Sequence, residues 1–337
     1  MKRRRIYCVF SRRIRPQPRL SVFRIHYSIQ YSTLYGEVGH MRVSSFMMSQ
    51  ASIDNILKQQ SDLLRAQSQL SSGKKILSPS DDPVATRKIL DLNDVISTFE
   101  QFQRNSDTAG FSLSLEESVL TSATDLLQRA RELAVQGLND PTGGIGRDKI
   151  ASEIRQIQDQ LLSLANTQDS DGQYIFGGFN STNIPFSGDG AGNFTFAGDQ
   201  GQKLLQVSST RQIAAGDSGY GIFMRLPGTT ANAFDTLYDL ATSLDANAPT
   251  QASLNDIDAI MQNIQTTRAS VGARQNAVDN QKTVNGDVIF SSKEILSSTQ
   301  DIDISEAVIE LNKRLTGLQA AQQTYTKIQG LSLFNFL

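Results

Sequence analysis

Apolar residues recur at intervals of three, four and seven along most of this chain of 337 residues, and this spacing predicts long amphipathic helices. Early in the chain one row repeats every seven residues, at Ile56, Leu63 and Leu70, and the companion positions of an a/d seam hold Ile53, Gln60 and Gln67. The longest uninterrupted seam lies near the end, at Ile304, Val308, Leu311, Leu315, Leu318, Gln322 and Tyr325. Because glutamine fills a dry core poorly, we expect the two seams to contact neighbouring copies as well as the molecule's own core.

Between these ends the same spacing predicts a bundle of helices. The first segments carry rows at Ile89, Leu92, Ile96 and Phe99, then at Leu120, Leu127 and Ala134, with a row of small residues at Ala123, Ala130 and Gly137 that would allow close helix approach. The Pro- and Gly-containing residues 139–144 interrupt the pattern, which resumes at Ile150, Ile154, Ile157, Leu161 and Leu164, so we expect an antiparallel helical hairpin. A later helix is predicted from Ile257, Met261, Ile264, Arg268, Val271, Gln275 and Val278.

The middle of the chain has a different composition. Half of its 24 glycines fall between Gly172 and Gly228, and the same stretch is rich in aromatic residues. Phe194 and Phe196 alternate with a polar residue and follow an Asp-Gly pair at 189–190, which is a hairpin-turn signal. We therefore expect a small antiparallel β domain here.

These patterns predict a fold that is mainly α with a β insertion, in which long terminal helices and an α-helical bundle flank the β domain. We expect an amino-terminal assembly segment at 41–82, the first half of the helical domain at 83–168, the β-rich inserted domain at 169–233, the second half of the helical domain at 234–300 and a carboxy-terminal assembly helix at 301–337.

Charge separates residues 1–40 from the rest. They contain nine Lys or Arg and one acid, Glu37, whereas Met41 to Leu337 contain 23 basic and 33 acidic residues, a net charge of −10. A basic arm could bind nucleic acid or anionic lipid, or serve in targeting, but arginines interrupt every apolar stretch of it and it lacks periodicity. We expect translation to begin at Met41. We also expect no nucleic-acid partner and no membrane partner, since no apolar run approaches about 18 residues.

From Met41 onward the chain has no His and no Cys. This removes the commonest general base, the thiol nucleophile and the imidazole and thiolate metal ligands. Carboxylate catalysis would need acids paired inside a cleft, and the sequence contains no such constellation. We therefore expect no catalytic residue, no cofactor, no metal and no disulfide, so that packing alone must stabilise the fold.

Two groups of acidic residues fit the role of helix caps better than a catalytic role. Asp82 can accept free N–H groups at a helix start, and Pro83 suits the first helical position; we favour this cap over a catalytic acid pair. Asp303 followed by Glu306 resembles a capping box.

Two loop motifs are likewise interpreted as connections. The Gly-rich residues 143–149 join two predicted helices and lack the Gly-Lys-Ser/Thr ending of a phosphate loop. Residues 169–172 and 189–190 lack the distal Glu of a calcium loop, so we expect turns there.

Both ends of the chain resemble the bacterial flagellin family. The amino-terminal signature is LSSGKKI at 70–76 followed by PSDDP at 79–83, and the carboxy-terminal one is RASVGARQN at 268–276 with LSLFNFL at 331–337. Within the family, MRVS at 41–44, DGQYIFGGF at 171–179 and PF at 185–186 resemble the hook–filament junction subunits more than the filament subunits. The resemblance covers essentially Met41 to Leu337.

The resemblance implies a structural subunit of the bacterial flagellum, exported unfolded through the flagellar secretion channel and located outside the cell. It implies a role in joining the hook to the filament, with further copies of itself, hook-associated protein 1, flagellin and a flagellar export chaperone as partners. The assembly interface would comprise Ile53, Ile56, Leu63, Leu70, Ile304, Val308, Leu311, Leu315, Leu318, Tyr325, Leu331, Phe334 and Leu337.

Three alternatives remain at this stage. Flagellin itself carries both terminal signatures, and location along the filament would distinguish it. A cytoplasmic coiled-coil scaffold would explain the heptads but not the signatures. An enzyme in the β insertion would need paired acids in a cleft.

Overall fold

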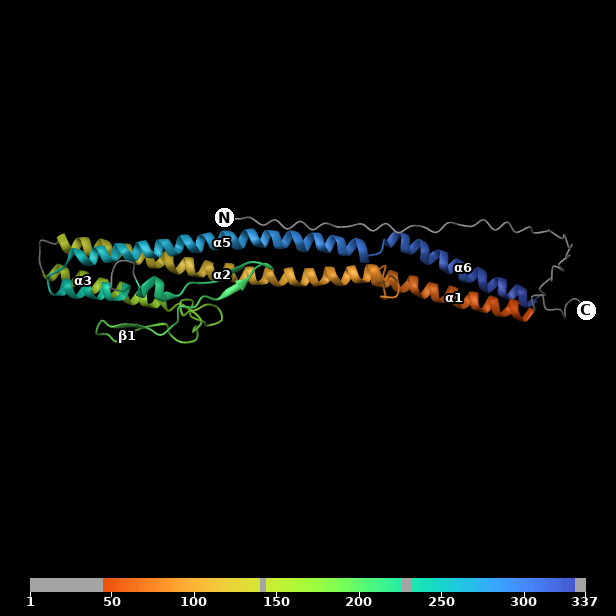
Figure 1. The fold of residues 1–337 in the computed structure, drawn as a ribbon, viewed down its shortest axis with the longest axis horizontal. Coiled ribbons are helices and arrows are strands. Elements are labelled where there is room, and N and C mark those ends of the chain that lie inside the picture. Colours follow the sequence, from red (N-terminus) through yellow and green to blue (C-terminus); the bar gives the residue numbers. More distant parts are fainter. Residues whose placement is uncertain (1–44, 140–143, 226–231, 331–337) are drawn as a thin grey trace, which may run out of the picture.

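The computed structural model describes residues 45–139, 144–225 and 232–330, and shows an elongated molecule whose long helices run along its length (Figure 1). Residues 1–44 and the closing Leu331, Phe334 and Leu337 lie outside the described residues. The predicted fold class, mainly α with a small antiparallel β insertion, is confirmed. The domain boundaries proposed from the sequence stay a prediction.

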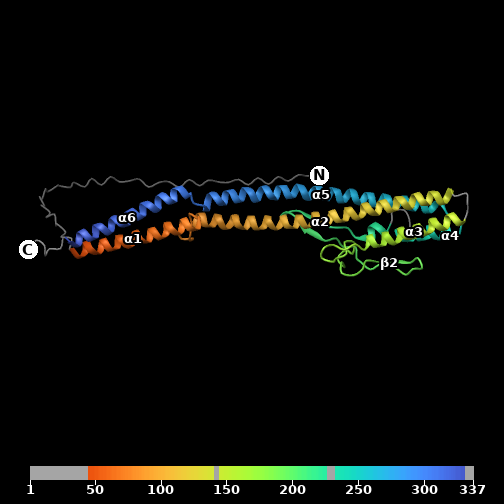
Figure 2. The same cartoon turned by 180° about the vertical axis from the view of Figure 1, so that it is seen from behind.

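The rod of the molecule consists of α2 (Pro83–Asn139) and α5 (Gln251–Gln300), which lie side by side and antiparallel (Figures 1 and 2). Every seventh residue of α5 is buried, at Ile257, Ile264, Val271, Val278, Asn285 and Ser292. Two rows of the same period are buried on α2, at Phe102, Ala109, Glu116, Ala123, Ala130 and Gly137 and at Ser106, Leu113, Leu120, Leu127 and Ala134. The rows that the sequence predicts for these helices therefore face the interior.

At one end of the rod, α3 (Gly144–Ala165) and α4 (Ala233–Asp245) complete a bundle with α2 and α5 (Figure 1). The predicted pairing of α2 with α3 is present. The small-residue row of α2 also has the predicted effect, because a Cβ at Gly137 would lie 2.5 Å from Leu244 Cδ2 of α4. The side chain of Asn232 caps α4 by accepting the N–H groups of Phe234 and Asp235.

The small antiparallel β insertion consists of two separate hairpins of three-residue strands. β1 (Phe186–Gly188) pairs antiparallel with β2 (Phe194–Phe196), and β3 (Leu204–Gln206) pairs with β4 (Gln212–Ala214). Turns with side-chain acceptors replace longer ladders: Asp189 Oδ1, for example, accepts the N–H groups of Ala191 and Asn193 at 2.8 and 3.1 Å. The predicted turn at 189–190 is confirmed, with Gly190 at a φ of 75°.

Aromatic rings join this insertion to the bundle. Phe186 of β1 packs against Phe223 and Phe234, with ring centroids 5.7 and 5.4 Å apart. Phe223 belongs to η1 (Tyr220–Met224), a single π-helical turn, and also contacts Phe176 at 5.5 Å. All four rings are almost fully buried, so they form one core with the bundle.

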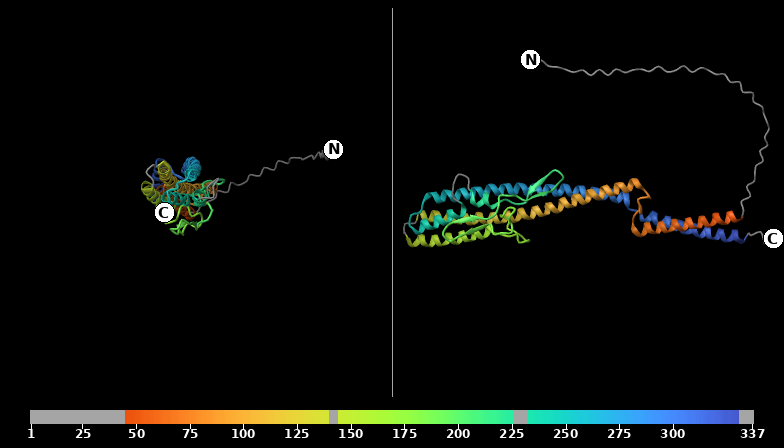
Figure 3. Two further views of the ribbon diagram at one scale, coloured as in Figure 1. Left: turned by 90° about the vertical axis from the view of Figure 1, so that its left-hand side faces the viewer. Right: turned by 60° about the horizontal axis from the view of Figure 1, so that its bottom comes forward.

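At the other end of the molecule, α1 (Ser45–Ser72) and α6 (Ile304–Gly330) pair to form an arm, which is offset from the rod (Figure 3). Residues 73–75 and 300–302, which we call the clasp, connect the arm to the rod. Lys75 N–H donates to Gln300 O at 2.7 Å and Ile302 N–H donates to Gly73 O at 3.0 Å. Gly73 has a φ of 69°, a left-handed conformation that favours glycine. Within the described ranges, every helix is too short or too polar to cross a bilayer.

Candidate assembly surface

The arm has almost no interior of its own. Of its described residues, Ala66 and Ala307 are the apolar side chains below a tenth exposed, at 8% and 6%. One row on each helix is half-buried, at Ile56, Leu63 and Leu70 on α1 and at Leu311, Leu318 and Tyr325 on α6. A pair of helices can bury only one stripe of each, so other apolar positions of the arm remain at its surface.

On α1, the companion row of the seam differs from the one expected. Gln60 and Gln67 are exposed, whereas Gln59 is half-buried and Ala66 is buried. Both choices satisfy the spacing from Ile56 and Leu63, so periodicity alone could not distinguish them. Packing selects Gln59 and Ala66 because they lie against α6, where Gln59 comes close to Gly317.

On α6, the expected seam is divided between two faces. Leu311, Leu318 and Tyr325 are half-buried, but Ile304, Val308, Leu315 and Gln322 are exposed. Ala307, Arg314 and Ala321 occupy the companion row instead. The apolar stripe of α6 is thus wider than the contact that a single partner helix makes.

The outer apolar residues of the arm are the main unexplained feature of its surface. We define them as Leu57, Leu64, Ile304, Val308, Ile309 and Leu315. Ile304 and Ile309 are 66% and 68% exposed, and Leu57 and Leu64 are 58% and 57% exposed. Several large aliphatic side chains exposed on one short helix pair are typical of a surface that a partner covers.

Ion pairs fix the alignment of the arm. Arg314 of α6 reaches Asp62 of α1 at 2.9 Å and Glu310 of its own helix at 2.6 Å. The hydrogen bond from Arg314 holds the pKa of Glu310 below its usual value. Such half-exposed pairs add little stability, but they select one antiparallel register of α1 against α6.

The two helix starts next to the clasp carry side-chain caps. Asp82 Oδ1 accepts the N–H groups of Val84 and Ala85 at 3.0 and 2.9 Å, and α2 begins at Pro83. Asp303 Oδ1 accepts the N–H groups of Ser305 and Glu306 at 2.8 and 3.3 Å at the start of α6. The amino-terminal signature therefore provides the turn and the helix start between arm and rod.

The described residues of this surface offer apolar contacts, ion pairs and helix caps. Its polar groups are ion pairs and caps, and the part of the chain that the structure describes has no group of three or more His, Cys, Asp or Glu placed to hold a metal. One unusual group elsewhere, the buried Glu116 of α2, was not predicted from the sequence. Its position in the heptad row between Ala109 and Ala123 was the available signal.

Sequence comparison relates the chain to flagellar proteins. Residues 43–181 match the family described as the bacterial flagellin N-terminal helical region. Flagellar hook-associated protein 3 of Escherichia coli strain K12 is 28% identical over 316 residues, which are 87% of this chain and 99% of that protein. A flagellin of Listeria innocua is 25% identical over 281 residues, 81% of this chain and 90% of that protein.

Structural comparison agrees on the fold. A solved structure of a putative flagellar hook-associated protein from Vibrio parahaemolyticus is similar with a TM-score of 0.61 and 22% identity. The similarity covers 66% of this chain and all of that one. The long antiparallel helices with a small β insertion are therefore a fold that a solved protein shares.

Proposed function

Because the chain is a relative of the bacterial flagellins and resembles flagellar hook-associated protein 3 over nearly all of that protein's length, we infer that it is a structural subunit of the flagellum. Its role would be to join the hook, through hook-associated protein 1, to the filament of flagellin. We further infer that it acts through assembly and not through catalysis.

The outer apolar residues of the arm are the observation that supports assembly best. Burying one large aliphatic side chain contributes about 1.5 to 3 kcal/mol, so covering several of them gives a substantial driving force for association. The sequence-derived interface, which includes Ile53, Ile56, Leu63 and Leu70 of α1, then divides into two parts. Half-buried rows hold α1 to α6, and exposed positions such as Val308 and Leu315 are left for neighbours.

The proposal includes the partners and location implied by the resemblance. These are further copies of the chain, hook-associated protein 1, flagellin and an export chaperone, at an extracellular site reached through the flagellar channel. The absence of cysteine after Met41 supports export, because no disulfide can then obstruct an unfolded chain.

The test replaces Val308 and Leu315 together by Asp. Both side chains are exposed, so the isolated subunit should fold, whereas two charges in a covered interface should prevent incorporation. In cells with this variant as their sole copy, we expect the subunit and flagellin in the medium and hooks without filaments by electron microscopy.

The matched control is Asn312→Asp with Gln319→Asp, which introduces the same charges at the same spacing on exposed polar positions of α6. Cells with this control should keep their filaments. Normal filaments on the Val308 and Leu315 variant would refute the proposal for this surface.

The alternative of a filament subunit is distinguished by location, since the Listeria flagellin matches almost as much of the chain. Labelled protein confined to the junction would support the adaptor role, and label along the whole filament would overturn it.

A further inference from the structure

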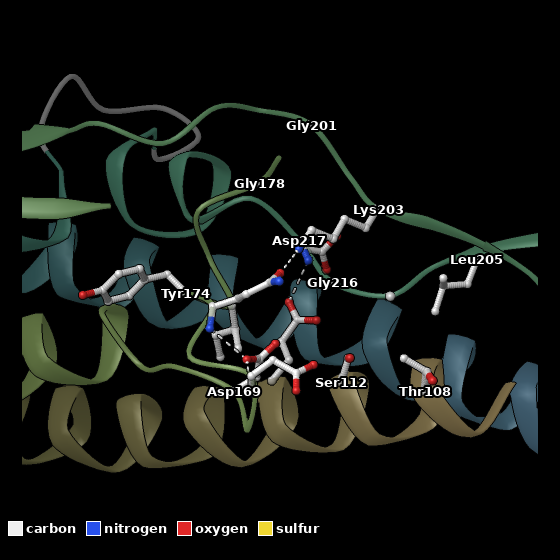
Figure 4. A pocket seen from close by; sticks show the side chains of 15 residues that line it. Thr108, Ser112, Asp169, Tyr174, Gly178, Gly201, Lys203, Leu205, Gly216 and Asp217 are labelled. Atoms are coloured by element: carbon white, nitrogen blue, oxygen red, sulfur yellow. Dashed lines mark hydrogen bonds between the residues drawn. The ribbon is translucent and has the colours of Figure 1, made fainter. Parts of the chain in front are cut away.

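A cavity of about 180 Å³ lies between α2 and the loops that carry the two hairpins (Figure 4). This volume is well above the roughly 10 to 15 Å³ that a single water molecule requires. One wall is formed by α2, with Thr108, Ser112 and Glu116, and the other walls come from residues 169–178 and 201–217. The cavity is remote in the sequence from the arm, and the inference below does not depend on the proposed function.

Glu116 is the unusual residue of this cavity. It occupies the heptad row of α2 between alanines and is only 2% exposed. Its Oε1 accepts the N–H of Asp217 at 3.2 Å, whereas its Oε2 has no hydrogen-bond partner among the described residues. An unpaired oxygen on a buried carboxyl group indicates that a hydrogen-bond partner is missing from the site, and for the ionised group that partner is a donor.

The nearby basic groups donate to other acceptors in the structure. Arg274 of α5 forms an ion pair with Asp217 and donates to Ala214 O at 3.1 Å. Lys203 Nζ donates to Gln173 Oε1 at 2.5 Å and to Ser181 Oγ at 3.1 Å.

The remaining charges that line the cavity are acidic. Asp169 and Asp171 have no ion pair in the described part of the chain, and the Oδ1 of Asp169 is occupied by the backbone N–H groups of Asp171 and Gln173. Carboxylates thus outnumber ammonium groups around the space. The described acids are not arranged as a metal site, so a bare metal ion does not fit the geometry.

We propose that this cavity binds a small organic cation with N–H donors, an alkylammonium or guanidinium ion, which donates to Glu116 Oε2 and is held by the charge of Asp169 and Asp171. Such an ion provides both the missing donor and the missing positive charge. Its size also suits the cavity, which is too large for one water molecule.

The protonation of Glu116 gives the binding a characteristic pH dependence. Burial, together with the neighbouring Asp217 carboxylate, raises the pKa of Glu116 to about 8, although Arg274 opposes both effects. Below that pH the cation must displace the carboxyl proton, so affinity should rise with pH up to about 8, by up to about tenfold per unit, and then level off. Binding at pH 7 should release a proton.

The experiment is a calorimetric titration of the full chain with methylguanidinium and with ethylammonium. Tetramethylammonium at equal ionic strength is the control ligand, because it has the charge but no N–H donor. We expect saturable binding of the first two ions, weaker binding of the third, and proton release in buffers of different ionisation enthalpy.

Two variants and a control assign the site. Glu116→Gln should weaken binding at least tenfold and abolish proton release, whereas Glu117→Gln should leave both unchanged, because Glu117 pairs with Arg268 and does not line the cavity. If Glu116→Gln does not fold, Asp171→Asn tests the site instead. Because Asp171 is exposed, this substitution should weaken binding severalfold without affecting the core.

Three results would overturn the proposal: no saturable binding, which would mean that the cavity holds water only, equal binding of tetramethylammonium, or binding unchanged by Glu116→Gln. If the Glu116→Gln variant does not fold, binding that is unchanged in the Asp171→Asn variant would overturn the proposal.

Discussion

The carboxyl group of Glu116 occupies a place in the rod where the heptad pattern calls for an apolar side chain. Burial raises its pKa in the folded state to about 8, from about 4.5 in the unfolded chain. The folded protein therefore holds a proton that the unfolded protein releases throughout this pH interval. The contribution of Glu116 protonation to the free energy of unfolding is fully present below pH 4.5. It is lost as pH rises towards 8, by up to about 1.4 kcal/mol per pH unit.

We predict that Glu116→Gln removes most of this pH dependence. Glutamine retains an oxygen for the Asp217 N–H but has no proton to lose, so the variant should be more stable than the wild type at pH 8 and similar to it at pH 5. Urea denaturation followed by circular dichroism at both pH values measures the difference. Parallel pH profiles of the two proteins would contradict the explanation.

A second residue-level prediction concerns two glycines with nearly the same left-handed backbone. Gly172 and Gly178 have φ values of 75° and 70°, but a Cβ at Gly172 meets nothing, whereas one at Gly178 would lie 2.5 Å from the carbonyl oxygen of Asp199. Gly172→Ala should lower the free energy of unfolding by about 1 to 2 kcal/mol through the backbone alone. Gly178→Ala should cost at least about 1 kcal/mol more, since the backbone of Asp199 must move. Equal denaturation midpoints for the two variants would contradict this.

Individual residues differed in how well the sequence predicted them. Asp82 could be predicted as a cap because the donors of a helix start are local and a following proline marks the position. Glu116 could not be recognised as a buried acid, because its burial depends on the β4 to η1 loop, which is about a hundred residues away in the sequence. Local chemistry is encoded within a few residues, whereas burial is decided by tertiary contacts.

At the scale of the elements, the two rows of α6 should respond differently to charge. Leu311→Asp with Leu318→Asp changes the half-buried row that faces α1, so we predict that the arm separates and that helical ellipticity falls. Val308→Asp with Leu315→Asp changes exposed positions and should leave the ellipticity of the isolated subunit near that of the wild type. Circular dichroism of the two purified variants makes the comparison. An equal loss of ellipticity in both variants would contradict the assignment of Leu311 and Leu318 to the row that faces α1.

The sequence predicted the helices better than it predicted their contacts. The period of α2 and α5 identified their buried rows because long helices repeat the same signal many times. On α6 the expected seam included both Leu311, which is half-buried, and Leu315, which is 40% exposed, because a wide apolar stripe does not show which part the partner helix covers. The small antiparallel β insertion was predicted, but its division into two hairpins of three-residue strands was not.

For the whole molecule, we predict that proteolysis of the isolated subunit begins at the arm. Among the described side chains of its helices, Ala66 and Ala307 are the apolar ones below a tenth exposed, and such contacts offset little of the roughly 1 to 2 kcal/mol of backbone entropy that each ordered residue loses. The bundle contains most of the buried apolar core and should persist. Limited proteolysis with mass analysis should therefore leave a core that begins near Pro83 and ends between Thr283 and Gln300. Cleavage within the bundle before the arm would contradict the prediction.

The chain connects the arm to the rod twice, between α1 and α2 and between α5 and α6. Both connections pass through the clasp, so the arm cannot bend at one of them alone. Changing its angle requires shearing the hydrogen bonds of Lys75 to Gln300 and of Ile302 to Gly73 together. Each bond contributes about 1 kcal/mol net, so breaking both bonds costs about 2 kcal/mol. A change in the offset visible in Figure 3 would therefore involve the α1–α2 and α5–α6 connections together.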